Sequence, residues 1–152
     1  MRLFGTLALA TLFVAAPAQA AGLVCPAGQK PPFASDAAAK KFFVGFVDAI
    51  FNSPDEAKLE GYFAPDYRAI LNGKAMDRAA EKAHFAEVRA NSRKIDYSYG
   101  RIIATCDGLA EQHAVTIEQK DGSKIALKAM SMIVIAKGRI RTIDEVAGAA
   151  DQ

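Results

Sequence analysis

Four extended segments in the second half of the chain are separated by very short turns, and this spacing constrains the fold most strongly. The turns lie at residues 106–108 (CDG), 120–123 (KDGS) and 137–138 (KG), and each contains a glycine of the kind that closes a β-hairpin. Strands joined by so few residues must run antiparallel, because a parallel connection needs about a dozen residues or more. From residue 94 onwards the sequence therefore predicts an antiparallel meander of four strands, with a bulge at Gly100 where the apolar alternation shifts.

One of these segments places a histidine among apolar residues. Leu109, Glu111, His113, Val115 and Ile117 occupy alternate positions, so their side chains share one face of a strand. A slip of one residue would expose the aliphatic members of this series. We therefore expect this face to be buried and His113 to point inward.

The first half of the chain is predicted to be helical. Ser35 can cap a helix whose apolar residues recur every three or four positions, a shorter helix is expected within residues 52–63, and Asp77 can cap a third. Between the last two, residues 66–76 (DYRAILNGKAM) predict a short hairpin, because Asn-Gly is a favoured hairpin turn. Helices that lead and a sheet that follows indicate an α+β fold. The apolar stripe of the first helix consists of Phe42, Phe43, Phe46, Val47, Ile50 and Phe51.

The 152 residues suit one folded domain, which is preceded by a segment with the features of a secretory signal peptide. Arg2 is followed by an apolar run at residues 3–16 and by AQA at residues 18–20, which predicts cleavage after Ala20. The run is shorter than the roughly 20 apolar residues that a membrane span needs. We therefore expect a periplasmic or secreted protein. The predicted divisions are a signal peptide at residues 1–20, an arm at residues 21–34 and a domain at residues 35–148.

Charge and cysteine content exclude several classes of function. The formal net charge is +2 and the basic residues are scattered, so no nucleic-acid surface is predicted. Cys25 and Cys106 would meet an oxidising compartment, where a disulfide between them would tie the arm to the end of a strand. Zinc is not expected, because the sequence has no paired-cysteine motif and His84 and His113 lie far apart. No metal and no cofactor are therefore predicted.

The order of these elements, with residues 62–85 (YFAPDYRAILNGKAMDRAAEKAHF) and 137–146 (KGRIRTIDEV), resembles the SnoaL-like branch of the nuclear transport factor 2 superfamily. The resemblance extends from Ser35 to about Val146. It implies a conical half-barrel, in which helices pack in the concave face of a strongly bent antiparallel sheet around an internal pocket. The family includes ketosteroid isomerase, scytalone dehydratase and polyketide cyclases, together with binding or accessory proteins that catalyse nothing.

The resemblance argues against isomerase chemistry. It places the catalytic carboxylate of the isomerase at Leu71 or Asn72, its protonated acid near Ser131 and its tyrosine near Phe46 or Val47. None of these residues supplies the group that enolisation requires, which is a carboxylate base with a pair of hydrogen-bond donors. An isomerase is therefore not expected.

Several polar and apolar residues lie on elements that face the pocket in the resembled fold, and some have a structural explanation as well. Asn72 could serve only its hairpin, Tyr67 could be a core residue with its hydroxyl at the surface, and His84 could be pocket wall or exposed surface. The candidate pocket residues are Phe46, Tyr67, Asn72, His84, Glu111, His113, Met130, Ser131 and Asp144.

Two functions follow from these residues. The first is an exported protein that binds a small apolar or amphipathic molecule, with Met132 and Ile133 among the expected walls. The second is a small lyase, hydrolase or cyclase that uses His113 with Glu111 or Asp144, since a carboxylate raises the basicity of a neighbouring imidazole. The same Glu111–His113 pair could also be a satisfied polar layer of the sheet. A homodimer is possible with either function, through a small, flat outer sheet face that carries Ala110, Ala114 and Thr116.

The signal peptide gives the first testable prediction. N-terminal sequencing of the protein isolated from the host's exported fraction should start at Ala21 or Gly22, because the signal peptidase cleaves after a small-x-small motif. Soluble mature protein that still begins at Met1 would contradict the prediction.

Overall fold

A computed structural model describes residues 23–53 and 55–150 of the chain. The predicted signal peptide at residues 1–20 therefore lies outside the described residues. Within the part that the structure describes, no helix is both long and apolar enough to cross a membrane.

Three helices form where the sequence offers a capping side chain. Helix α1 (Asp36–Phe51) starts after Ser35, whose hydroxyl accepts a hydrogen bond from the backbone N–H of Ala38. Helix α3 (Arg78–Asn91) starts in the same way after Asp77, and the short helix α2 (Glu56–Glu60) starts after Asp55. Such a cap satisfies one of the backbone donors that the first turn leaves free. The predicted caps of the first and third helices are confirmed.

The strands form one six-stranded sheet in the order β2-β1-β6-β5-β4-β3. The four strands from β3 onwards form the predicted antiparallel meander, and β1 and β2 form the predicted hairpin. Strand β1 also pairs with β6, and this pair is parallel, so the sheet is mixed rather than wholly antiparallel. The strands are β1 (Phe63–Leu71), β2 (Lys74–Asp77), β3 (Ser92–Ala104), β4 (Gly108–Gln119), β5 (Lys124–Ala136) and β6 (Arg139–Ala149).

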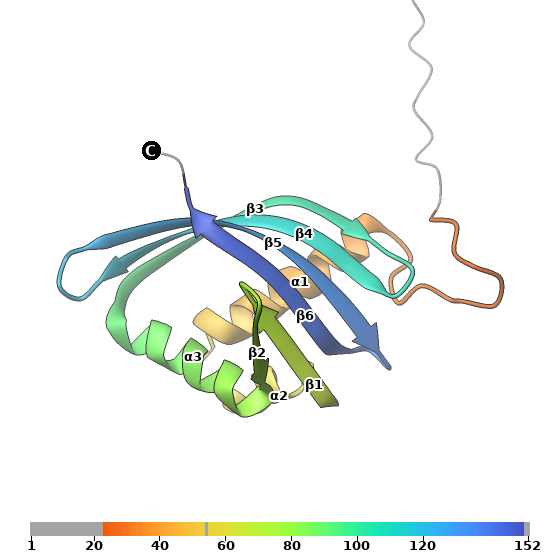
Figure 1. Cartoon of the computed structure of the whole chain (residues 1–152), viewed down its shortest axis with the longest axis horizontal. Helices are drawn as coiled ribbons and strands as arrows, with labels where there is room; N and C mark the ends of the chain where they lie inside the picture. The colour runs from red at the N-terminus through yellow and green to blue at the C-terminus, as the bar shows by residue number, and fades with distance from the viewer. Residues whose placement is uncertain (1–22, 54, 151–152) are drawn as a thin grey trace, which may run out of the picture.

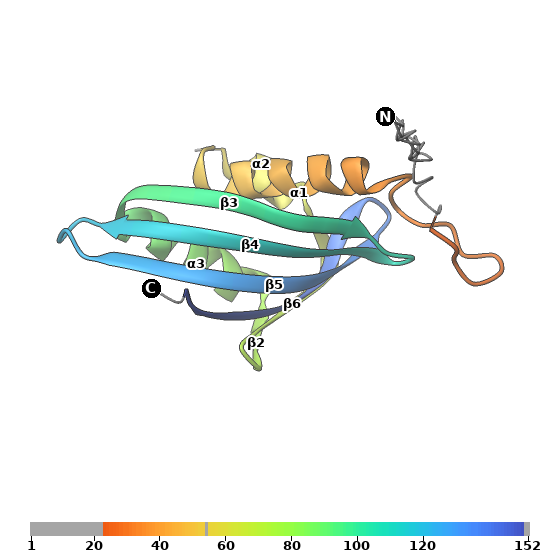
Figure 2. The ribbon, with the colours of Figure 1, turned by 90° about the horizontal axis from the view of Figure 1, so that it is seen from above.

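The parallel pair follows from the path of the chain. After the β1–β2 hairpin, α3 carries the chain to the opposite edge of the sheet, where β3 begins. The meander then returns strand by strand until β6 lies beside β1 (Figures 1 and 2). No local signal in β1 or β6 specifies this contact, because it depends on where the whole meander ends.

The long strands arch over α1 and α3, so that the helices lie against the concave face of the sheet (Figure 1). The pairing of β3 with β4 shifts between Tyr99 and Ile102, which confirms the predicted bulge at Gly100. A Cβ atom at Gly100 would lie only 3.0 Å from the carbonyl oxygen of Gln112, so the two strands approach closely here. A bulge of this kind increases the bend of the strand.

Aromatic packing joins α1 to the concave face. The ring of Phe46 packs against the rings of Tyr62, Phe63 and Phe85, with centroids 5.5 to 6.4 Å apart. Burying one large apolar side chain contributes roughly 1.5–3 kcal/mol, so this contact contributes a large share of the stability of a small domain. From the sheet, the most deeply buried large side chains are Tyr67, Phe63, Leu109, Ile133 and Ile140.

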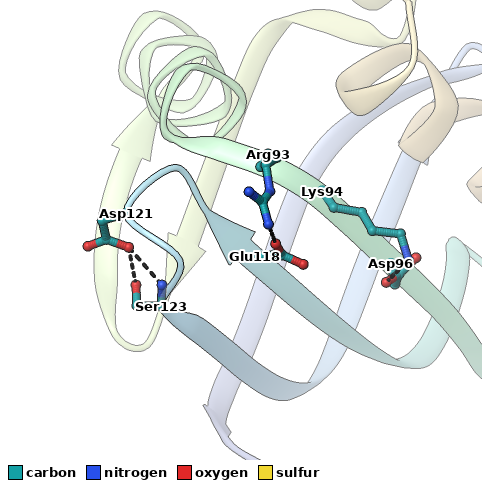
Figure 3. Close-up of polar contacts among 6 residues, drawn as sticks. All are labelled: Arg93, Lys94, Asp96, Glu118, Asp121 and Ser123. Atoms are coloured by element: carbon teal, nitrogen blue, oxygen red, sulfur yellow. Dashed lines mark hydrogen bonds and ion pairs between the residues drawn. The ribbon is translucent and has the colours of Figure 1, made fainter.

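Polar contacts cover the exposed end of the β3 edge (Figure 3). Arg93 pairs with Glu118 on the neighbouring strand, and Lys94 Nζ lies 2.7 Å from Asp96 Oδ2. Asp121 accepts hydrogen bonds from the N–H and the hydroxyl of Ser123 and so shapes the β4–β5 turn. Surface pairs of this kind contribute at most about 1 kcal/mol each, but charges along an edge strand oppose pairing with other chains.

The N-terminal arm is held at the β3–β4 turn. Cys25 and Cys106 form a disulfide, with Cα atoms 5.4 Å apart. The side-chain amide of Gln29 also donates a hydrogen bond to the carbonyl oxygen of Cys106, at 2.9 Å. The arm is therefore tied to the same end of the sheet by a covalent bond and by a hydrogen bond.

Removing this disulfide should destabilise the protein. The Cys25→Ser/Cys106→Ser variant should lose about 2–4 kcal/mol of unfolding free energy in urea titrations, because the bond closes a loop with a sequence separation of 81. The unfolding free energy of the wild-type protein should fall by the same amount in excess dithiothreitol. The reductant should leave the unfolding free energy of the variant unchanged. Equal stability of the oxidised wild type and the variant would contradict the prediction.

Candidate functional site

A cavity of about 300 Å³ lies between the helices α1 and α3 and the concave face of the sheet. Its volume lies at the lower end of the range usual for small-molecule sites. Aromatic and aliphatic side chains line most of it, and the few polar side chains come from α3 and from strands β4, β5 and β6. The walls include Phe43, Phe46, Phe85, Val115, Leu127 and Ile133.

Strand pairing brings three polar residues into one row, two of which line the cavity, whereas the predicted pocket residue Glu111 lies beside the lining. Glu111 of β4 lies opposite Ser131 of β5, and Ser131 lies opposite Glu145 of β6. Directly paired residues point to the same side of a sheet, so all three face the helices. Ser131 and Glu145 line the cavity, and the Ser131 hydroxyl donates a hydrogen bond of 2.8 Å to Glu145 Oε2.

His113 lies two residues after Glu111 on the same face and lines the cavity. Its Nδ1 atom lies 3.0 and 3.1 Å from the two carboxylate oxygens of Glu111, and the two side chains are only 7% and 0% exposed. The ring of Tyr97 stacks on the imidazole, with centroids 4.5 Å apart. In a neutral imidazole, a carboxylate at Nδ1 favours the tautomer that carries the proton on that nitrogen and the lone pair on Nε2.

Helix α3 adds a carboxylate that sequence reasoning missed. Glu81 is 6% exposed and lines the cavity, and among the described residues neither its Oε2 atom nor the hydroxyl of Tyr67 has a hydrogen-bond partner. Burial raises the pKa of Glu81 to about 7; the charge of Glu145 adds to this effect and the neighbouring Tyr67 hydroxyl opposes it. Burial also raises the pKa values of Tyr67 and Tyr97, so both phenols stay protonated at neutral pH.

The sequence did contain a signal for both missed carboxylates. Glu81, Phe85 and Val88 follow one another at helical spacing and all line the cavity, so they form one face of α3. In β6, Glu145 lies two residues after the buried Ile143 and therefore shares its face.

The same alternation of buried and exposed positions shows that three of the predicted pocket residues lie outside the cavity. Asp144 lies between Ile143 and Glu145 and is exposed on the opposite side of the sheet from the cavity, so it cannot assist His113. Met130 and Met132 flank the inward-facing Ser131 and are 60% and 54% exposed. These methionines belong to the convex face, so they are not cavity walls.

The other predicted residues divide between the cavity and the hairpin. Phe46 and Ile133 line the cavity and are 3% and 2% exposed, while His84 is exposed and lies at the cavity rim. Tyr67 is not part of the cavity lining; it is 1% exposed, so its hydroxyl is inside the fold rather than at the surface. Asn72 lies outside the cavity lining and has a structural role, because its Oδ1 accepts a hydrogen bond from the backbone N–H of Ala147.

The outer face of the sheet is more apolar than the sequence suggested. Besides the half-buried Ala114 and the exposed Thr116, it carries the exposed side chains of Met130, Met132 and Val146, of which Val146 is 67% exposed. Strand pairing places Met130 directly opposite Val146, so their side chains are neighbours. A homodimer through this face stays a prediction.

Comparisons with known proteins identify the fold. No protein-family model matches the sequence. An uncharacterized protein of Schizosaccharomyces pombe is 24% identical over 112 residues, which cover 74% of this chain and 84% of that protein. Among solved structures, AclR of Streptomyces galilaeus, a candidate hydroxylase, superposes with a TM-score of 0.66 at 15% identity, over 76% of this chain and 81% of that one.

A candidate SnoaL-like polyketide cyclase from Jannaschia sp. CCS1 superposes with a TM-score of 0.62 at 12% identity, over 72% of this chain and 84% of that one. The mixed sheet bent around a few helices is therefore the cone fold that SnoaL-like and nuclear-transport-factor-2-like proteins share. At these identities the comparisons establish the fold and leave the function to the residues of the site.

The raised pKa of Glu81 gives a pH prediction. Between about pH 4.5 and pH 7 the folded protein keeps a proton on Glu81 that the unfolded chain releases, so this residue makes stability fall as the pH rises. Relative to Glu81→Gln, the wild type should lose on the order of 2 kcal/mol of unfolding free energy between pH 5 and pH 8. Urea titrations at several pH values measure this difference.

The exposed Glu87 on the same helix offers a matched control. The unfolding free energy of Glu87→Gln should depend on pH as that of the wild type does. The unfolding free energy of Glu81→Gln should change less with pH. Parallel profiles for all three proteins would show that Glu81 titrates normally.

Proposed function

We propose that this protein binds a small, largely apolar molecule in its cavity and holds a polar group of that molecule beside His113. The observation that carries the proposal is the way in which apolar and polar side chains are distributed in the cavity lining. Apolar walls such as Phe46 and Phe85 surround a small polar cluster of Glu81, His113 and Glu145. Apolar walls with a few convergent polar groups are the usual composition of a small-molecule site, in which the polar groups orient the ligand.

Two further observations support this function. The solved structures with the same fold include proteins named as candidate polyketide cyclases, which is consistent with a cone that accommodates an apolar ring system. None of the isomerase-like positions at Leu71, Asn72 or Phe46 supplies a catalytic acid or base, so isomerase-type enolisation has no support.

We further propose that binding takes place outside the cytoplasm. The signal-peptide pattern at residues 1–20 supports export, and the Cys25–Cys106 disulfide is of a kind that persists in oxidising compartments.

Acid–base catalysis is a second candidate function, and the Glu111–His113 pair favours it. With its proton held on Nδ1, the imidazole can accept a proton from a bound molecule at Nε2, and Glu111 would stabilise the imidazolium that forms. This arrangement suits a lyase or cyclase that starts by proton abstraction. The test uses a ligand that co-purifies with the protein. Catalysis would be established if the wild type converts this ligand and His113→Gln binds it without converting it. If the wild type does not convert the ligand, catalysis would be excluded.

Filling the cavity should abolish binding. Ala147 lines the cavity and is half-buried, so the Ala147→Phe side chain should occupy the space of a ligand. The neutral fluorophore 1-aminoanthracene should bind the wild type, and the variant should bind it at least tenfold more weakly in a fluorescence titration.

Ala149 lies two residues further along β6, is exposed and is not part of the lining, so Ala149→Phe is the matched control. Both variants should keep a wild-type melting temperature within a few degrees. Equal binding by both variants would place the fluorophore elsewhere and overturn the proposed site.

A further inference from the structure

We infer that the ligand of this cavity is an organic cation, with an ammonium group seated between Glu81 and Glu145 and an apolar body against the aromatic walls. The inference rests on the proposed function and adds the charge class of the ligand to it.

Carboxylates border the cavity without a lysine or arginine in the described part of its lining. Glu81 and Glu145 line the cavity directly, and Glu111 lies beside them with both oxygens on His113 Nδ1. Among the described residues that line the cavity there is no lysine and no arginine, and the remaining base, His84, is exposed at the rim. Both oxygens of Glu111 are engaged by His113, whereas Glu81 and Glu145 have no lysine or arginine beside them in the lining that the structure describes.

The hydrogen-bonding state of these two carboxylates leads to the same conclusion. Glu145 Oε2 accepts one bond from the neutral hydroxyl of Ser131. Glu81 is 6% exposed and faces the cavity, and in the described part of the chain neither its Oε2 atom nor the neighbouring Tyr67 hydroxyl has a hydrogen-bond partner within bonding geometry. Buried carboxylates normally have a hydrogen-bond donor, a cation or a metal beside them. A ligand that brings positive charge would supply the missing partner, whereas an anionic ligand would be repelled.

The walls favour an ammonium group over a bare metal ion. The rings of Phe43, Phe46, Phe85 and Tyr97 surround the same space, and aromatic faces attract alkylammonium groups through cation–π interactions. One ligand atom each from Glu111, His113 and Glu145 lies within 4.8 Å of the others, which a metal ion could bridge. However, both oxygens of Glu111 are already engaged by the imidazole, and an ion would leave most of the 300 Å³ cavity unused.

A pair of probes of equal shape tests the inference on the full mature protein. Benzyltrimethylammonium and neopentylbenzene differ in that a carbon atom replaces the charged nitrogen, so a purely apolar cavity should prefer the neutral compound. We expect the cation to displace 1-aminoanthracene from the wild type at a concentration at least tenfold lower than neopentylbenzene.

The carboxylate variants assign this preference to named residues. At pH 8, above the pKa of about 7 of Glu81, Glu145→Gln and Glu81→Gln should each weaken binding of the cation about tenfold and leave binding of the neutral probe nearly unchanged. Asp144→Asn removes the same charge on the opposite face of β6 and should change neither probe. Since each variant is compared on two probes, a general loss of folding would be visible as equal loss of both.

The possible failures are distinguishable. If the neutral probe binds as well as the cation, or better, the inference is wrong while the proposed apolar site stands. If neither probe nor the fluorophore binds, the proposed function itself fails. If equilibrium dialysis shows stoichiometric Zn²⁺ retention that Glu145→Gln abolishes, and the cation has no advantage, the carboxylates serve a metal and the inference is overturned.

Discussion

Burial of the concave sheet face against α1 is the interaction on which the rest of the structure depends. The sheet is bent, so its inner face can be shielded from water only by something that lies within the curve, and the aromatic face of α1 provides this cover (Figure 1). Phe43 and Phe46 contribute through contacts that reach β1, α3 and His113. Each large apolar side chain buried in this way contributes roughly 1.5–3 kcal/mol, which offsets part of the entropy lost on ordering the chain.

The same burial produces the cavity. The helices and the sheet enclose a space that their side chains do not fill, and polar residues border it at Glu81, His113 and Glu145. A face made only of apolar residues would be more stable, because carboxylates lose their hydration when they are buried. The row Glu111–Ser131–Glu145 is held by strand pairing rather than by loops, so the backbone that builds the sheet also fixes the spacing of the polar groups.

Local signals were sufficient to predict most of the elements. The caps at Ser35 and Asp77, the glycine-containing turns and the bulge at Gly100 are each specified by a few neighbouring residues, and the structure confirms them. The errors in the candidate site have a different origin. The resemblance predicts Asp144 and Met130 in the pocket, although the alternation of buried positions in their strands puts them outside. Glu145 could have been found by that alternation, and Glu81 by the spacing to Phe85 on α3.

The sequence by itself determined the order of the elements, the inward direction of His113 and its place on the same strand face as Glu111, because alternate residues of one strand lie on one face. Only the tertiary structure decided that β6 lies parallel to β1, that Glu145 and Glu81 join this pair around one cavity, and that the Tyr67 hydroxyl is buried. These contacts link residues that are far apart in the chain. Their geometry depends on the accumulated bend and register of the whole sheet and on the angle at which α3 crosses it, and no short segment carries that information.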